Sequence, residues 1–134
     1  MSIYVDSSAL VKRYIAEDKR DEAEAILLSD LVWVTARHTY VEVSLTLHRR
    51  LAGPDLAIGR EAFNYDWSRT RVVALDDALC RSAAELGAVA ESRALDALHL
   101  AAADRAGGRS IPIITFDVRL ARAARSLGFA VIGA

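Results

Sequence analysis

The sequence predicts a three-layer α/β/α domain built around a five-stranded parallel sheet, and three observations lead to that prediction. Short apolar runs rich in β-branched and aromatic residues alternate with helical patterns along the chain. The runs are continuous, as expected for strands that are buried on both faces of a parallel sheet. Two of the runs end on an aspartate, and the carboxyl edge of such a sheet is where ligands bind.

Size and composition limit what the chain can be. A length of 134 residues is typical of one domain, so we expect residues 1–134 to form a single domain with an ample core. No apolar run approaches the roughly 20 residues that span a membrane, and no signal-peptide pattern opens the chain. We therefore expect a cytoplasmic protein without membrane contact. The single Cys80 excludes an internal disulfide and a Cys-rich zinc site, and its Ala-rich helical surroundings indicate a core residue.

The charge of the chain bears on nucleic-acid binding. The formal net charge of −1 gives no global basic signature. Of the 17 positively charged residues, 15 are arginine, which suits bidentate phosphate recognition but also follows from GC-rich coding. Any nucleic-acid site must therefore be local.

The amino-terminal half is predicted to hold two strands and four helices. The first strand ends at Asp6, after which Ser7 or Ser8 can cap a helix. Thr35 can cap the third helix, and a Gly-Pro pair separates it from the fourth. The expected elements are a strand up to residue 5, a helix over residues 8–17, a helix opened by the charged run 17–22, a strand over residues 31–34, a helix through residue 51 and a helix over residues 54–68.

The carboxy-terminal half is predicted to alternate strands and helices. Asp76 or Asp77 can cap the fifth helix, whereas a Gly-Gly pair ends the sixth and Gly128 caps the last. The expected elements are a strand over residues 72–75, a helix through residue 90, a helix over residues 92–106, a strand over residues 111–116, a helix over residues 118–127 and a strand over residues 129–132.

Two aspartates share one local pattern. Asp6 and Asp117 each stand after a predicted strand and before a helix. Either carboxylate can serve simply as the N-cap of the following helix. If both strands are central and parallel, however, the two carboxylates lie on the same edge of the sheet. Thr115, two residues before Asp117, can offer a hydroxyl to that edge.

Glu42 lies within the third predicted helix, shortly after its start. A glutamate in this position is either solvated, with Arg49 as a surface partner, or turned toward the same edge of the sheet.

Asp96 lies in a segment, residues 95–103, that is apolar nearly all round, which is typical of a buried helix. An ionised carboxylate there costs several kcal/mol unless it is paired, protonated or bound to a cation. With Ser92 as the cap, Asp96 lies past the first helical turn and gains little from the helix dipole. Arg93 is its nearest candidate partner.

A shared cation explains these four acids together. Two carboxylates about 4 Å apart repel each other by about 4 kcal/mol at an effective dielectric constant of about 20. Oxygen ligands without a Cys or His cluster favour a hard ion, Mg²⁺ or Mn²⁺, over zinc. One or two such ions would activate a water and neutralise a scissile phosphate, so the acids predict phosphodiester hydrolysis.

Four motifs in this order resemble those of the PIN-domain ribonucleases, and more closely those of the VapC toxins of bacterial toxin–antitoxin pairs. The motifs are V-D-S-S-A-L-V-K, Y-V-E-V-S-L, L-D-A-L-H-L-A-A-A and T-F-D-V-R-L-A-R-A-A, and they extend over the whole chain. The resemblance places the family's acidic quartet on Asp6, Glu42, Asp96 and Asp117. It places the family's hydroxyl groups on Ser7 or Ser8 and on Thr115, with Ser7 standing where threonine is more usual.

The resemblance implies a PIN-like fold and a toxin that is an Mg²⁺- or Mn²⁺-dependent endoribonuclease leaving 5′-phosphate and 3′-hydroxyl ends. It also implies a homodimer, or a larger toxin–antitoxin assembly, inhibited by a VapB-type antitoxin whose tail enters the active-site groove. The RNA target stays open among transfer, messenger and ribosomal RNA, because specificity would depend on loops and on dimer geometry that the sequence does not give.

Other polar residues near the quartet have several interpretations. Arg93 and Arg119 flank quartet acids and either contact RNA phosphate or fix a carboxylate. Asp104 is expected to be a peripheral acid, with tuning of the site as the alternative. His99, one turn from Asp96, is expected to be a packed core histidine rather than a base.

Three other classes of protein are alternatives to a nuclease as interpretations of this sequence. A receiver domain would need an acidic pair after the first strand and a late lysine, but no lysine follows Lys19. A dehalogenase-type phosphatase would need an aspartate where Ser8 stands. A PIN-fold module that binds RNA or protein without cleaving it is the main alternative.

Overall fold

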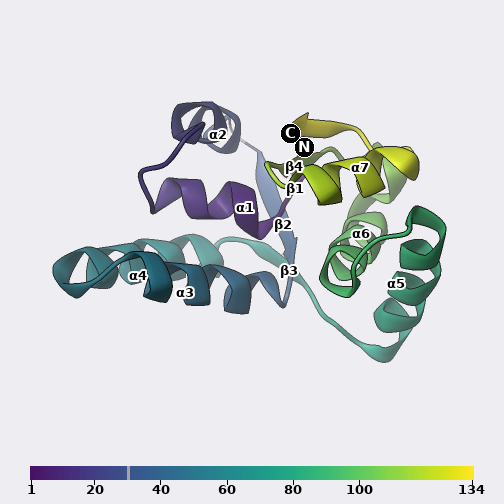
Figure 1. Cartoon of the computed structure of the whole chain (residues 1–134), viewed down its shortest axis with the longest axis horizontal. Coiled ribbons are helices and arrows are strands. Elements are labelled where there is room, and N and C mark those ends of the chain that lie inside the picture. The colour runs from purple at the N-terminus through teal and green to yellow at the C-terminus, as the bar shows by residue number, and fades with distance from the viewer. Residues whose placement is uncertain (30) are drawn as a thin grey trace.

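The computed structural model describes residues 1–29 and 31–134 and shows a sheet with helices on both faces (Figure 1). The sheet has five strands in the order β3-β2-β1-β4-β5, and every neighbouring pair is parallel. This confirms the predicted α/β architecture. The strands are β1 (Ser2–Val5), β2 (Val32–Ala36), β3 (Arg71–Val73), β4 (Ile113–Thr115) and β5 (Val131–Gly133).

The helices divide between the two faces of the sheet. One face carries the helices of the amino-terminal half and the other those of the carboxy-terminal half (Figure 1). On the first face lie α1 (Ser7–Leu10), continued by a 3₁₀ turn (Val11–Arg13), α2 (Arg20–Leu27), α3 (Thr39–Arg50) and α4 (Gly53–Ser68). On the second lie α5 (Asp77–Ala90), α6 (Ala94–Gly107), followed by a 3₁₀ turn (Gly108–Ser110), and α7 (Val118–Ser126). None of the described helices combines the length and apolar character that a membrane crossing needs.

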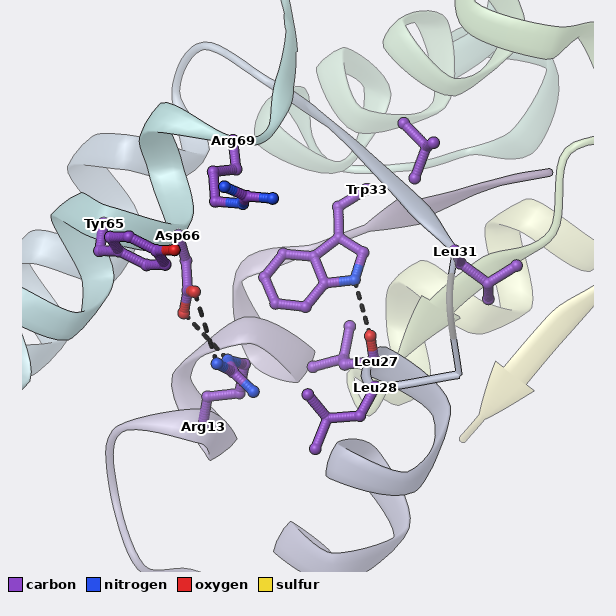
Figure 2. A pocket seen from close by; sticks show the side chains of 9 residues that line it. Arg13, Leu27, Leu28, Leu31, Trp33, Tyr65, Asp66 and Arg69 are labelled. Atoms are coloured by element: carbon purple, nitrogen blue, oxygen red, sulfur yellow. Dashed lines mark hydrogen bonds and ion pairs between the residues drawn. The ribbon is translucent and has the colours of Figure 1, made fainter.

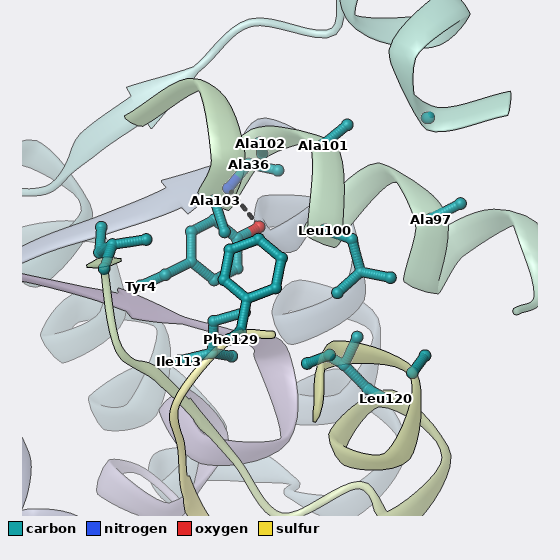
Figure 3. Packing of buried hydrophobic residues seen from close by; sticks show 14 of the residues in the cluster. Tyr4, Ala36, Ala97, Leu100, Ala101, Ala102, Ala103, Ile113, Leu120 and Phe129 are labelled. Carbon is teal, nitrogen blue, oxygen red and sulfur yellow. Dashed lines mark hydrogen bonds between the residues drawn. The ribbon is translucent and has the colours of Figure 1, made fainter. Parts of the chain in front are cut away.

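Side-chain alternation in β1 separates the two cores. Ile3 and Val5 pack with the helices of the amino-terminal half, whereas Tyr4 points to α5, α6 and α7. Figure 3 shows Tyr4 packed against the small side chains of α6, which let that helix approach the sheet closely. The alanines from Ala101 to Ala103 are all buried, which explains the nearly uninterrupted apolar pattern of this segment.

The strand order fixes where a ligand can bind. The chain changes faces between β3 and β4, so the helices that follow β1 and β4 leave on opposite faces of the sheet. Because β1 and β4 are neighbours, a crevice can open beyond their carboxyl ends, where the strand order reverses.

Several predicted boundaries differ from the structure. The first helix is much shorter than residues 8–17, and its N-cap is Asp6 rather than Ser7 or Ser8, because the Asp6 side chain accepts from the Ala9 amide. Thr35 lies inside β2 instead of capping the third helix, and its hydroxyl donates to the Val5 carbonyl at 2.6 Å.

Two further expectations about the carboxy-terminal helices are wrong. The N-cap of α6 is Arg93 rather than Ser92, so the helix begins later than predicted. Cys80 is exposed on α5 and is not a core residue, because the apolar face of this amphipathic helix is formed by Leu79, Ala83 and Gly87.

A polar cluster links the 3₁₀ turn that follows α1 to helix α4. Asp66 accepts hydrogen bonds from Arg13 Nε at 3.0 Å and from the Tyr14 hydroxyl at 2.6 Å. Figure 2 shows Asp66 and Arg13 together on one wall of a pocket, with Trp33 opposite donating to the Leu27 carbonyl. Since Trp33 stands near the amino end of β2, this pocket lies away from the carboxyl edge of the sheet.

Replacing Asp66 by alanine is expected to lower the free energy of unfolding by about 2–3 kcal/mol. The Arg13 guanidinium and the Tyr14 hydroxyl, both partly buried, would then lose their shared acceptor. Urea denaturation measures the effect, with Glu61→Ala on the exposed side of α4 as the matched control, expected within about 0.5 kcal/mol of the wild type. Equal midpoints for Asp66→Ala and the wild type would contradict the prediction.

Candidate active site

The carboxyl edge of the sheet collects acids from four elements. Asp6 follows β1 and Asp117 follows β4, and these strands are paired in register from Tyr4 with Ile113 to Val5 with Ile114. Glu42 lies in the first turn of α3.

Asp96 lies in the first turn of α6, and not beyond it as predicted, because the helix begins after Arg93. In that turn the Asp96 side chain lies beside the positive end of the α6 dipole.

Asp6 is the most deeply buried of the four acids, with 3% of its surface exposed. Its Oδ1 accepts from Ser8 Oγ at 2.8 Å and from the Ala9 amide at 3.1 Å, and its Oδ2 accepts from Thr115 Oγ1 at 2.8 Å. Burial raises the pKa of Asp6, although His99 and these hydrogen bonds act in the opposite direction. Two of the predicted hydroxyl residues, Ser8 and Thr115, thus hold the carboxylate of Asp6.

Arg93 joins two of the acids. Its guanidinium lies 2.8 Å from Asp96 Oδ2 and 3.1 Å from Asp117 Oδ2. The expected Arg93–Asp96 pair is therefore present, and it extends to an acid from another element. Asp117 also caps α7 by accepting from the Arg119 amide at 2.8 Å, so its capping role and its place at this edge coexist.

One interpretation of the sequence expected Glu42 to pair with Arg49, but its partners in the structure are two histidines. Its Oε1 lies 2.9 Å from His99 Nε2 and 3.8 Å from His38 Nε2. Burial alone would raise the pKa of Glu42, but His99, His38 and a hydrogen bond from Ser7 outweigh it and lower the pKa. Ser8 therefore bonds to Asp6 at 2.8 Å, whereas Ser7 contributes only to the lowered pKa of Glu42.

Sequence reasoning assigned no role to His38 and only a packing role to His99. The structure confirms that His99 is buried, and it adds bonds from its two ring nitrogens to Tyr4 and Glu42. Burial and the neighbouring His99 lower the pKa of His38 to about 4, so its ring is neutral at neutral pH. The four-residue spacing between His38, the N-cap of α3, and Glu42 in its first turn was the signal that could have indicated this contact.

Ligand atoms of three side chains, His38, Glu42 and His99, lie within 4.8 Å of one another. Among the described residues, no three of the acids Asp6, Glu42, Asp96 and Asp117 are this close together.

The donor set of the four acids nevertheless fits a hard divalent cation. The Arg93 guanidinium already bridges Asp96 and Asp117, so these two carboxylates are close enough to share one positive charge. His99 lies close enough to both Asp6 and Glu42 to oppose the rise that burial causes in the pKa of Asp6 and to contribute to the lowered pKa of Glu42. Carboxylate oxygens are the ligands that Mg²⁺ and Mn²⁺ prefer.

A basic pocket adjoins the acids. A cavity of about 290 Å³ lies between the start of α6 and the exposed side of α7, with Asp96 on its wall. The residues that line it are Glu91, Ser92, Arg93, Asp96, Arg119 and Arg122. Asp104, by contrast, pairs with Arg109 at 3.0 Å, as expected for a peripheral acid.

Comparisons with known proteins agree with this architecture. A family model described as "PIN domain" matches residues 3–126. "Ribonuclease VapC35" of Mycobacterium tuberculosis is 36% identical over 135 residues, covering 97% of this chain and 95% of that protein. "Ribonuclease VapC46" of the same organism is 34% identical over 131 residues, covering 98% of this chain and 96% of that protein.

Solved structures share the fold at low sequence identity. VapC20 of Mycobacterium tuberculosis, described as a "Sarcin-Ricin loop cleaving toxin", superposes with a TM-score of 0.77 at 21% identity, covering 99% of this chain and all (100%) of that one. FitAcB from Neisseria gonorrhoeae superposes with a TM-score of 0.79 at 16% identity, covering 98% and 96% of the two chains.

Proposed function

This chain belongs to the PIN-domain family and, within it, to the VapC ribonucleases, and we propose that it is the toxin of a type II toxin–antitoxin pair that cleaves RNA with a divalent cation. In this proposal Asp6, Glu42, Asp96 and Asp117 hold Mg²⁺ or Mn²⁺. The reaction is endonucleolytic hydrolysis that leaves 5′-phosphate and 3′-hydroxyl ends. The observation that supports the proposal is that Asp6 and Asp117 follow neighbouring parallel strands at the switch point of the sheet and that Arg93 contacts both Asp96 and Asp117.

The chain's own residues have defined tasks in such a site. A bound Mg²⁺ or Mn²⁺ supplies charge neutralisation at the phosphate and a more acidic water. Ser8 and Thr115 orient the Asp6 carboxylate through both of its oxygens. Arg93 holds Asp96 and Asp117 in place, and it is exposed enough to contact the substrate as well.

The basic pocket beside Asp96 supports contact with the RNA backbone. Arg93, Arg119 and Arg122 all line it, and guanidinium groups recognise phosphate bidentately. This concentration of arginine makes a local basic site in a chain of net charge −1.

Replacing Arg119 or Arg122 by alanine is therefore expected to weaken RNA binding and to reduce the salt dependence of that binding. Each lost phosphate contact should lower the slope of log K against log [salt] by about 0.7 for single-stranded RNA. Fluorescence anisotropy at several salt concentrations measures it, with Arg81→Ala on α5, remote from the pocket, as the matched control. Slopes equal to that of the wild type would exclude these arginines from the RNA contact.

We also propose a VapB-type antitoxin as the inhibitory partner, and a homodimer as the basic assembly. Several solved relatives of this fold are toxin–antitoxin complexes, among them VapBC2 from Rickettsia felis and a complex from Klebsiella pneumoniae. Exposed apolar side chains on α3, Val41 and Leu45, favour an additional protein contact. We expect the protein to act in the cytoplasm, where its proposed substrate and partner occur.

The proposed activity is tested with purified protein free of antitoxin. RNA should be cleaved with Mg²⁺ or Mn²⁺ and left intact with EDTA, and the new 5′ ends should carry phosphate. RNA binding without cleavage under any metal condition would instead support the alternative, a PIN-fold module that binds RNA or protein. Sequencing the 5′ ends generated in cells would identify the RNA target.

A further inference from the structure

A buried hydrogen-bonded chain connects the core of the molecule to Glu42. Tyr4 in β1 and His99 in α6 are almost inaccessible to solvent, and Tyr4 Oη lies 2.7 Å from His99 Nδ1. The other ring nitrogen, Nε2, lies 2.9 Å from Glu42 Oε1. Building on the proposed nuclease function, we propose that Tyr4 and His99 are positioning residues that fix the Glu42 carboxylate as a ligand for the divalent cation.

The donors and acceptors of these residues restrict the direction in which their hydrogen bonds can run. A carboxylate can only accept, so His99 Nε2 must carry a hydrogen and donate it to Glu42. Tyr4 Oη accepts from the Ala36 amide at 3.1 Å, and its own hydrogen is available for donation to His99 Nδ1. These contacts allow one continuous direction of donation, from Ala36 through Tyr4 and His99 to Glu42, in which His99 carries a hydrogen on Nε2.

This direction has a consequence for the carboxylate of Glu42. The His99 donor fixes Oε1, so the conformational freedom of a partly exposed glutamate is reduced and Oε2 remains to bind a cation. The contact also joins α6 to α3 across the edge of the sheet, and a second link runs from His38 Nε2 to the Leu95 carbonyl at 3.3 Å. Ligands that are held in this way are typical of protein metal sites.

The same assignment argues against a separate transition-metal centre formed by His38, Glu42 and His99. A metal ligated by His99 Nε2 would need the lone pair that this tautomer replaces with a hydrogen. The hydrogen bond from Tyr4 favours that tautomer, so the trio is better explained by hydrogen bonding.

Mn²⁺ binding to the purified protein without RNA, measured by calorimetry, tests the proposal directly. His99→Phe keeps an aromatic ring but removes the donor, and it should weaken Mn²⁺ binding by about 10- to 100-fold. His99→Gln keeps an N–H near the position of Nε2 and should remain within a few-fold of the wild type. His48→Gln, an exposed histidine at the end of α3, is the matched control and should bind as the wild type does.

The Mn²⁺ requirement of RNA cleavage should follow the same order. The concentration for half-maximal rate should rise in His99→Phe, while the rate at saturating Mn²⁺ largely recovers. A lowered maximal rate with an unchanged Mn²⁺ requirement would overturn the positioning role. Wild-type protein that binds Mn²⁺ with this dependence on His99 but cleaves no RNA would contradict the nuclease function and leave the positioning role intact.

The tautomer of His99 gives an independent readout if His99→Phe fails to fold. Nitrogen-15 NMR of the histidine rings should show His99 in the Nε2–H form, and Tyr4→Phe should allow the Nδ1–H form to appear and weaken Mn²⁺ binding. An Nδ1–H tautomer in the wild type, or Mn²⁺ binding that is unchanged in Tyr4→Phe, would overturn the proposal.

Discussion

Asp96→Asn is expected to lower the rate of RNA cleavage by about 10³-fold, which corresponds to about 4 kcal/mol of transition-state stabilisation. The change removes a negative charge from the proposed cation site and leaves the shape of the side chain nearly unaltered. Asp96 is 7% exposed and its main partner is Arg93, whose guanidinium is half exposed and can be solvated. Activity should therefore fall far more than stability does.

The measurement is the single-turnover rate with saturating Mg²⁺ or Mn²⁺, together with the far-UV circular dichroism spectrum, which should not change. Asp104→Asn is the matched control, because it makes the same change on the same helix at an acid that pairs only with a surface arginine. Cleavage by Asp96→Asn at the wild-type rate would point to a contaminating nuclease or to another site.

Asp6→Asn is expected to be at least as stable as the wild type in EDTA and to lose both activity and stabilisation by metal. Burial raises the folded-state pKa of Asp6 above its unfolded value, so its contribution to stability is present at low pH and is lost as the pH rises through the folded pKa. At neutral pH the ionised carboxylate is therefore a cost, which the neutral amide removes.

The amide can keep the local hydrogen bonds. Asparagine caps a helix about as well as aspartate, so the bond from the Ala9 amide is retained. The Thr115 hydroxyl can accept from the new amide group and turn its hydrogen to Ser8 Oγ, 3.2 Å away. These replacements explain why the loss of charge at Asp6 should not unfold α1.

Urea denaturation at neutral pH, with EDTA and with Mn²⁺, tests this expectation. At a metal concentration of 100 times Kd the wild type should gain about 2.7 kcal/mol, whereas Asp6→Asn should gain nothing. Asp21→Asn in the exposed first turn of α2 is the matched control and should respond as the wild type does. A large loss of stability by Asp6→Asn in EDTA would mean that Asp6 is mainly a structural cap.

Local patterns in the sequence were sufficient for much of the fold. The continuous apolar runs identified all five strands of the sheet, and the Gly-Pro break and the Asp76 cap placed α4 and α5 closely. Errors arose where a long-range bond competes with a local signal. Thr35 has the character of a helix cap, but its hydroxyl is used by the Val5 carbonyl, 30 residues away in the sequence.

The site shows the same division between local and long-range information. Burial of Asp96 in an apolar helix and the repeated strand–Asp–helix pattern made the acids conspicuous in the sequence. Arg93 and Thr115 were visible there as candidates, but the exact pairing was not, because Arg93 also reaches Asp117 over 24 residues and Thr115 reaches Asp6 over 109.

The sequence alone determined which segments are buried and which carboxylates interrupt them, since side-chain periodicity records the faces of each strand and helix directly. The tertiary structure decided that β1 lies beside β4, and hence that Asp6 and Asp117 share one edge. It also decided that His99 donates to Glu42 rather than only filling the core. Strand order and such contacts depend on how whole helices pack across the sheet, and no local window of residues contains that information.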